Sequence, residues 1–213
     1  MKLLIPKESP RLILRWTQRV LSAGAIALLG YCAFVLLDSW YFQNRQSRDL
    51  DRLVRSARIA NTPVEMPQAG SPAAPQAPPN LAAGDLIGRI EIPRLGLSAV
   101  IVEGIGGRDL RRAVGHIPGT PLPGQPGNAA IAGHRDTFFR PLKEVLVDDI
   151  IVLTTQGGEH RYRVVWSRMT TPDDVAVLDP TRNAVLTLVT CYPFYFVGPA
   201  PDRFIVRAEK VTS

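Results

Sequence analysis

The sequence contains very little cysteine: two of its 213 residues, Cys32 and Cys191. This scarcity excludes the class of small secreted domains that depend on several disulfides. Cys32 lies inside a long apolar run, whereas Cys191 ends the strand-like stretch AVLTLVTC near the C-terminus. We therefore predict no disulfide within the chain. Cys191 is then a buried inert thiol, half of an intermolecular bridge, or a thiol with a chemical role.

The C-terminal part of the chain lacks the excess of positive charge that a nucleic-acid-binding domain would need. The net charge is +6, but residues 1–82 contain ten Lys and Arg against five Asp and Glu. Residues 83–213 contain fifteen against fourteen, without a base-stacking motif. We therefore exclude nucleic acid as a partner. The three histidines and two cysteines also lack zinc-ligand spacing, so we predict no metal and no cofactor.

Only one apolar run, Val20 to Leu37, is long enough to cross a bilayer. As a helix, its 18 uncharged residues extend about 27 Å, close to the roughly 30 Å hydrocarbon core of a membrane. Residues 1–19 contain five basic side chains, which favours a cytoplasmic N-terminus. A cleaved signal peptide is the alternative, but no small-x-small site directly follows the run. We predict a single-pass protein of the cell membrane, with a transmembrane helix at residues 20–37 and its C-terminal part outside the cytoplasm.

The segment after this run divides into two parts. Residues 38–60 have mixed charge, with apolar Leu50, Leu53 and Val54 at helical spacing, and we predict a juxtamembrane helix there. Residues 61–84 are rich in proline, alanine and glutamine and have no apolar periodicity. This composition is typical of a semi-extended linker.

Residues 85–213 have the pattern of a mainly β domain. Seven short apolar stretches, bounded by Gly and Pro, are strand candidates: DLIGRIEIP, LSAVIVEG, NAAIAGH, DIIVLTTQ, HRYRVVWSRMT, AVLTLVTC and RFIVRAEKV. Short helices are expected around 109–114, 139–145 and 172–178. This density of strands favours a closed or nearly closed β-barrel over a βαβ fold.

A thiol becomes a catalyst when a neighbour favours its thiolate or moves protons. His134 ends the apolar run AAIAGH as Cys191 ends its own, so both side chains are expected at one rim of the barrel. His116 is the second candidate, in a stretch rich in Pro and Gly. His160 begins a strand beside a Gly-Gly turn. We therefore predict His134 as the partner of Cys191.

Arg203 is the third candidate for this site. It opens a strand twelve residues after Cys191. We predict that the intervening loop returns the chain so that Arg203 lies alongside the thiol. A guanidinium offers directional donors to an oxyanion or a peptide carbonyl. Arg207 is the alternative, on the same face but about 13 Å farther along the strand.

Three stretches, GHIPGTPLPGQPGNAAIAGHRDTFFRPL, TLVTCYPF and PDRFIVRA, resemble the sortase family of membrane-anchored cysteine transpeptidases. The TLxTC pattern and the N-terminal anchor are similar to class D members. The resemblance covers about residues 85–211 and implies an eight-stranded β-barrel. It also implies that Cys191 is the nucleophile, His134 the general acid and base, and Arg203 the group that holds substrate or stabilises the oxyanion.

The same resemblance implies the partners of the reaction. Cys191 would cleave an LPxT-like sorting signal near the C-terminus of a protein substrate, through a thioacyl-enzyme. An amine of the cell wall or of a pilus subunit would then accept the substrate protein. The alternatives are a thiol protease that uses water as acceptor and an inactive membrane-tethered module that binds peptides.

An aromatic cluster follows the cysteine: Tyr192, Phe194, Tyr195 and Phe196. We predict that this loop forms one wall of a groove for the sorting peptide, with Thr190, Tyr192, Phe194 and Tyr195 as substrate-binding residues. The competing interpretation is that these rings pack into the core.

Overall fold

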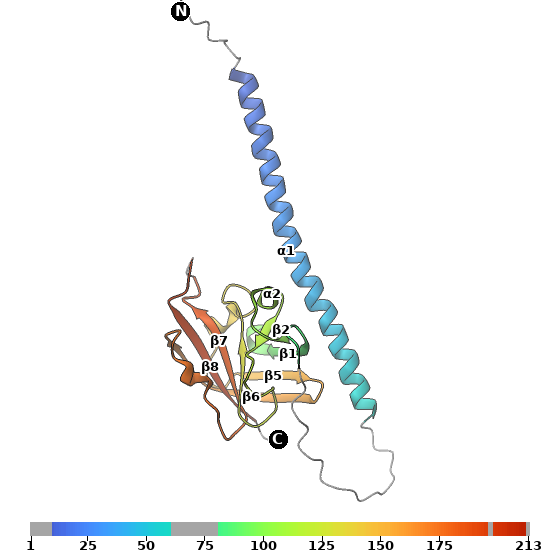
Figure 1. The fold of residues 1–213 in the computed structure, drawn as a ribbon, viewed down its shortest axis with the longest axis vertical. Helices are drawn as coiled ribbons and strands as arrows, with labels where there is room; N and C mark the ends of the chain where they lie inside the picture. The colour runs from blue at the N-terminus through green and yellow to red at the C-terminus, as the bar shows by residue number, and fades with distance from the viewer. Residues whose placement is uncertain (1–9, 61–80, 196–197, 212–213) are drawn as a thin grey trace, which may run out of the picture. The chain divides into compact units, whose positions relative to one another are not determined.

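The computed structural model describes residues 10–60, 81–195 and 198–211 (Figure 1). The chain divides into two units, Met1–Tyr41 and Phe42–Ser213. The first unit consists, in its described part, of one helix. The second contains the end of that helix and the β domain.

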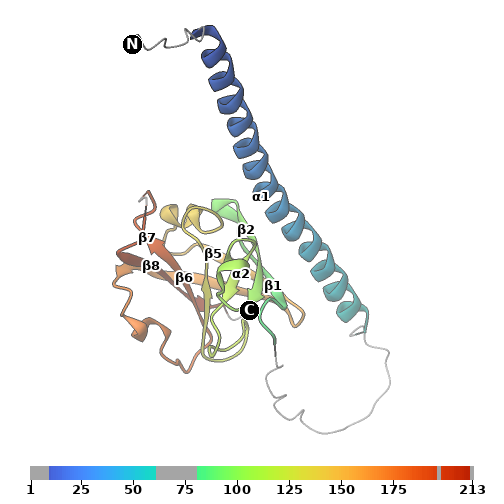
Figure 2. The same ribbon diagram turned by 45° about the horizontal axis from the view of Figure 1, so that its top comes forward.

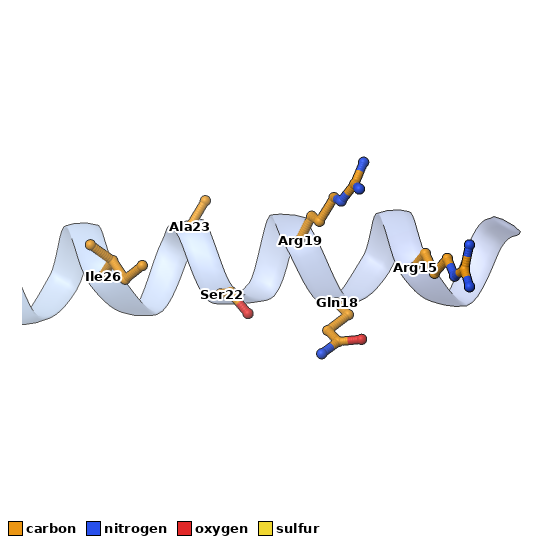
Figure 3. Close-up of a pocket in the computed structure, with 6 residues that line it drawn as sticks. All are labelled: Arg15, Gln18, Arg19, Ser22, Ala23 and Ile26. Carbon is orange, nitrogen blue, oxygen red and sulfur yellow. The ribbon is translucent and has the colours of Figure 1, made fainter. Parts of the chain in front are cut away.

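The predicted transmembrane segment lies within a single helix, α1 (Pro10–Ala60). Its stretch Leu14–Arg52 is long and apolar enough to cross a membrane, with a mean hydropathy of 2.3 in its most apolar window, and no part of that window is buried. The predicted juxtamembrane helix is the continuation of α1. Figure 3 shows that long polar and cationic side chains give way to small and apolar ones near the start of this span. Arg15, Gln18 and Arg19 are followed by Ser22, Ala23 and Ile26.

The last turns of α1 contact the β domain within the second unit. Phe42 packs against the apolar cluster formed by Val100, Val102 and Ala113. The Gln43 side chain accepts a hydrogen bond from the Val100 N–H at 2.9 Å. Leu50 is fully buried, which fits the apolar face predicted for this helix. The side chains of Leu53 and Val54 lie outside the described residues.

The β domain is a closed barrel of eight strands in the order β1-β2-β3-β4-β7-β8-β6-β5 (Figures 1 and 2). The predicted fold class is confirmed. Two neighbouring pairs, β2–β3 and β4–β7, are parallel, and the others are antiparallel. The strands are β1 (Leu86–Ile92), β2 (Leu97–Glu103), β3 (Val114–His116), β4 (Asn128–Ala132), β5 (Ile150–Thr155), β6 (Gly158–Thr170), β7 (Val185–Tyr192) and β8 (Asp202–Lys210).

Seven of these strands coincide with the predicted stretches, and β3 is the one that the pattern missed. Its three residues, Val-Gly-His, are too few for an alternation of apolar and polar side chains to be visible. The short helices are near the expected places: α2 (Gly107–Leu110), η2 (Arg140–Glu144) and η3 (Val175–Leu178), with a further 3-10 turn, η1 (Pro93–Leu95). The first predicted helix therefore ends earlier than expected, because Val114 begins β3.

Alternation along the strands separates the inside of the barrel from its outer face. In β7, Leu186 and Leu188 belong to the buried core, and in β4, Ala129 and Ile131 do. Because successive side chains of a strand point to opposite faces, the residues between them point outward. By the same alternation Cys191, three residues after Leu188 in β7, points outward.

One ion pair joins the β1–β2 connection to the β4–β5 connection, at the end of the barrel where β1 stops and β5 starts. Arg94 in η1 makes a bidentate contact with Asp149, which immediately precedes β5, with Nη2–Oδ2 at 2.6 Å. The same guanidinium donates to the Glu144 carbonyl, and the Asp149 carboxylate accepts from the Leu146 N–H at 2.9 Å. The hydrogen bond from Arg94 lowers the pKa of Asp149, and the backbone hydrogen bond lowers it further against the opposing effect of burial.

We expect Asp149→Asn to lower the free energy of unfolding at pH 7 by about 1.5–3 kcal/mol, because a partly buried, charge-assisted contact is lost. A carboxyl whose folded pKa is depressed stabilises the fold above its unfolded pKa, near 3.9, and this contribution disappears as the pH falls through the lower folded value. The variant should therefore lose less stability than the wild type between pH 5 and pH 2. Chemical denaturation at several pH values measures both effects.

Asp148→Asn is the matched control, because the Asp148 side chain is 72% exposed and pairs with Arg163 only at 3.7 Å, whereas the Asp149 side chain is 5% exposed. Its stability is expected to stay within about 0.5 kcal/mol of the wild type. Equal losses in the two variants would contradict a special role for the Arg94 contact.

Candidate active site

Strand register places Arg203 directly opposite Cys191. In the antiparallel pair β7–β8, these two residues are Cα partners near the end of β7 and the start of β8. Directly opposite residues have Cβ atoms about 4.5–5.5 Å apart and point to the same face. β7 and β8 lie side by side in both views (Figures 1 and 2).

The register on the other side of β7 places His134 level with the cysteine. In the parallel pair β4–β7, the last Cα partners are Ala132 and Val189. The ladder continues beyond them, because the Gly133 N–H donates to the Val189 carbonyl at 3.1 Å. His134 and Cys191 each lie two residues past this last pair, so they occupy adjacent positions on the same face.

Cys191 thus lies between an imidazole and a guanidinium on the outer face of the barrel. All three side chains are partly exposed and accessible to a ligand. The Arg203 guanidinium donates from Nη1 to the carbonyls of Asp202 and Ala200, at 3.0 and 3.4 Å, which holds it at the end of the β7–β8 connection. A nucleophile, a group that transfers protons and a cationic donor are the parts needed for covalent cleavage of an amide.

The alternative arginine, Arg207, is part of a different contact set. Its Cα partner in β7 is Thr187, four residues from Cys191 along the strand. Its Nη2 donates to the Val177 carbonyl at 2.8 Å, and its guanidinium lies 5.4 Å from the centre of the Trp166 ring. Burial lowers the pKa of Arg207, and the nearby charge of Arg168 lowers it further. Arg207 therefore anchors η3 and does not lie beside the thiol.

Neither of the two other histidines lies beside Cys191: His116 pairs with Ile131 of β4 and is buried, and His160 lies at the opposite end of the barrel. His116 ends β3, where its Nδ1 contacts the Glu103 carboxylate at 2.7 Å and its Nε2 is near the Thr120 hydroxyl and the Pro121 carbonyl, at 3.0 and 3.1 Å. His160 is near the start of β6, whose far end, Thr170, is the residue that pairs with Arg203. Burial lowers the pKa of His160, and the nearby charge of Lys210 adds to this effect. His134 is the histidine level with Cys191.

The predicted substrate-binding residues occupy different environments. Thr190 is buried, and its hydroxyl donates to the Gly133 carbonyl at 2.8 Å. Tyr192 and Phe194 form a ring cluster with Phe204, with centroids 5.3–6.4 Å apart, and Phe194 also packs against the core. Tyr195 is 73% exposed. The fourth ring of the predicted cluster, Phe196, lies outside the described residues.

Sequence reasoning missed two cationic residues that hold the loop after β7. Arg135, next to His134, donates from Nη2 to the Gly198 carbonyl at 2.9 Å. Lys143 in η2 donates to the Tyr195 hydroxyl at 2.8 Å, and this hydrogen bond raises the pKa of the Lys143 ammonium. Both contacts join residues more than fifty positions apart, and one of them ends on a backbone carbonyl. No pattern of residue types contains that information.

The Sortase domain family matches residues 90–211 of this chain. Sortase D of Bacillus subtilis (strain 168) is 30% identical over 198 residues, which cover 89% of this chain and 95% of that protein. Sortase A of Listeria monocytogenes is 28% identical over 110 residues, which cover 50% of this chain and 49% of that protein.

Two solved structures extend the comparison to the fold. A Clostridium perfringens sortase D5 transpeptidase superposes with a TM-score of 0.63 at 25% identity, covering 81% of this chain and 99% of that chain. Sortase E1 from Streptomyces coelicolor, solved with a tripeptide in the active site, superposes with a TM-score of 0.55 at 31% identity, covering 61% and 90%. The family resemblance seen in the sequence is confirmed.

Proposed function

Because the chain belongs to the sortase family, we propose that it is a membrane-anchored cysteine transpeptidase that cuts an LPxT-like sorting signal. The cleaved protein is transferred to an amine of the cell envelope or of a pilus subunit. The observation that carries this proposal is the row formed by His134 just after β4, Cys191 in β7 and Arg203 in β8.

The first half of the reaction forms a thioester. The Cys191 thiol gives its proton to His134, its sulfur attacks the carbonyl carbon of the scissile peptide bond, and negative charge develops on the carbonyl oxygen. Arg203 donates hydrogen bonds to this oxygen or to a neighbouring carbonyl of the peptide. As the tetrahedral intermediate collapses, the carbon–nitrogen bond breaks and His134 gives a proton to the leaving amine. The N-terminal part of the substrate remains as an acyl group on Cys191.

The second half transfers that acyl group. His134, now neutral, takes a proton from the incoming amine as its nitrogen attacks the thioester carbon. The carbon–sulfur bond breaks, a new amide forms, and the sulfur of Cys191 is released. Water in place of the amine gives hydrolysis by the same steps, so the acceptor decides between transpeptidase and protease.

The proposed location is the membrane, with the N-terminus in the cytoplasm and the barrel outside. Arg15 and Arg19 lie near the N-terminal end of the stretch Leu14–Arg52 of α1 (Figure 3). Cationic side chains on that side favour retention of the N-terminus in the cytoplasm. Tyr195, four residues after Cys191 in the sequence, is the most exposed of the proposed substrate-binding side chains.

The test is to trap the acyl-enzyme. Full-length protein in detergent is incubated with a library of sorting peptides, and the peptide that contains Cys191 is examined by mass spectrometry for a thioester. Addition of triglycine or diaminopimelate should convert the thioester to a ligated product. A thioester that yields only hydrolysed peptide would support the protease, and no acylation by any peptide of the library would favour the inactive binding module.

We expect Arg203→Lys to lower kcat/KM for a cleaved peptide by about 10²–10³-fold, because a lysine cannot reproduce two directional donors from one plane. Arg207→Lys is the control, since Arg207 is on the same strand and face but opposite Thr187. Its kcat/KM is expected to change by less than about fivefold. Steady-state kinetics decide, and equal effects of the two substitutions would remove Arg203 from the proposed site.

A further inference from the structure

We propose that Thr190 is a positioning residue, whose hydroxyl sets the spacing between His134 and Cys191 by holding the carbonyl of Gly133. This proposal rests on the proposed function, because it concerns the pair that would carry the proton transfer. It differs from the substrate-binding role predicted for Thr190 from the sequence.

Both backbone groups of Gly133 are held by the two residues that precede Cys191. Its N–H donates to the Val189 carbonyl at 3.1 Å, and its carbonyl accepts from the Thr190 hydroxyl at 2.8 Å. Gly133 directly precedes His134. The Thr190 hydroxyl therefore joins Thr190, which directly precedes Cys191, to Gly133, which directly precedes His134. The two joined residues are 57 positions apart in sequence.

The Thr190 side chain is on the wrong face to contact a peptide bound at Cys191. It alternates with Cys191 along β7 and shares the inward face with Leu186 and Leu188, which are core residues. Only 2% of Thr190 is exposed. Its hydroxyl is therefore directed at the protein backbone, in a place that substrate does not reach.

A second contact holds the chain on the other side of His134. The Phe139 N–H donates to the His134 carbonyl at 3.1 Å, and the Phe139 ring is fully buried. A Cβ atom on Gly133 would lie 2.7 Å from this ring, so the ring packs where only glycine leaves room. With Thr190 on one side and Phe139 on the other, the backbone of His134 has little freedom to move away from Cys191.

Removing the hydroxyl leaves the Gly133 carbonyl without its side-chain donor in a buried place. The strand end is then expected to shift until the carbonyl finds another partner, and His134 shifts with it. A displacement of about 1 Å between reacting groups is enough to cost around 10²-fold in rate. The hydroxyl thus affects catalysis without touching substrate.

The test uses Thr190→Val, which removes the hydroxyl at nearly constant shape, and Thr190→Ser, which keeps it. Thr187→Val is the matched control: Thr187 is also a buried threonine of β7, and its hydroxyl also bonds across to β4, on the Asn128 side chain. The readout is the rate at which iodoacetamide alkylates Cys191 between pH 5 and pH 10 in the full-length protein. Mass spectrometry of the Cys191 peptide separates this signal from Cys32, and His134→Ala supplies the profile of an uncoupled thiol.

We expect the pH profile of Thr190→Val to move toward that of His134→Ala, and its kcat to fall about 10–100-fold with KM within twofold. Thr190→Ser and Thr187→Val should keep the wild-type profile and kcat, although Thr187→Val loses stability. Gly133→Ala, which forces the same peptide away from Phe139, is expected to shift the profile like Thr190→Val. It provides an independent test if the valine variant does not fold.

Two results would overturn the proposal alone: a wild-type profile and kcat in Thr190→Val and Gly133→Ala, or an effect of Thr190→Val confined to KM. A wild-type profile in His134→Ala would instead reject the Cys191–His134 pair itself, and with it both this proposal and the proposed function.

Discussion

Cys191→Ala is expected to abolish thioester formation and to lower peptide cleavage by roughly 10⁴-fold or more, because no other group at the site can form the covalent intermediate. Cys191→Ser should be nearly as inactive, since a hydroxyl is a much weaker nucleophile than a thiolate near neutral pH. Both variants are expected to fold, because the Cys191 side chain is partly exposed and is not one of the residues of the hydrophobic core. Mass spectrometry of the acyl-enzyme and an assay of released peptide measure the loss.

The control for this experiment is Cys32→Ala. Cys32 is the other thiol of the chain and is exposed on α1, in the apolar stretch. Its replacement should leave peptide cleavage unchanged. A chain that still cleaves peptide after loss of Cys191, or that loses cleavage with Cys32, would contradict the proposed nucleophile.

His134→Ala is expected to lower kcat by about 10²–10⁴-fold, the usual effect of removing a general acid and base. The leaving amine would then depart without a positioned proton donor, and the incoming amine would lose its proton acceptor. Binding of the peptide depends less on the imidazole, so KM should change little. Steady-state kinetics with a cleaved peptide, and the rate of thioester formation in single turnovers, measure the two steps.

The two other histidines serve as controls. One is expected to affect neither kcat nor stability, and the other is expected to affect stability alone. His160→Gln, at the far end of β6, should keep both kcat and stability close to the wild type. His116→Gln should lose stability, since both ring nitrogens of His116 have partners in the fold, but should keep its kcat per folded molecule. A loss of kcat in either variant as large as in His134→Ala would contradict the assignment.

Much of the barrel was predictable because residues that face the core recur at every second position along its strands. In β7, the apolar residues Leu186 and Leu188 point inward and the residues between them point outward. The pattern of residue types is visible in one sequence, since it depends only on the period of a strand. β3 was missed for the opposite reason, because three residues contain no period and its pairing depends on β2 and β4.

The aromatic residues after Cys191 show that residue type alone does not predict which side chains are buried. Phe194 and Tyr195 are neighbours with the same class of side chain, yet Phe194 packs against the core and Tyr195 is exposed to solvent beside Lys143. Groove wall and core packing were both open from the sequence. The loop's path decides between them for each ring, and that path depends on distant residues such as Arg135.

The sequence by itself determined the long apolar helix, the β character of the domain, the scarcity of thiols and the family to which the chain belongs. Each of these follows from local composition, a repeating period or a motif. Only the tertiary structure decided that His134 and Arg203, and not His116 or Arg207, are level with Cys191, and that the Thr190 hydroxyl faces the Gly133 carbonyl. The physical reason is that these neighbours depend on the register between strands, which is set when the whole barrel closes and packs its core.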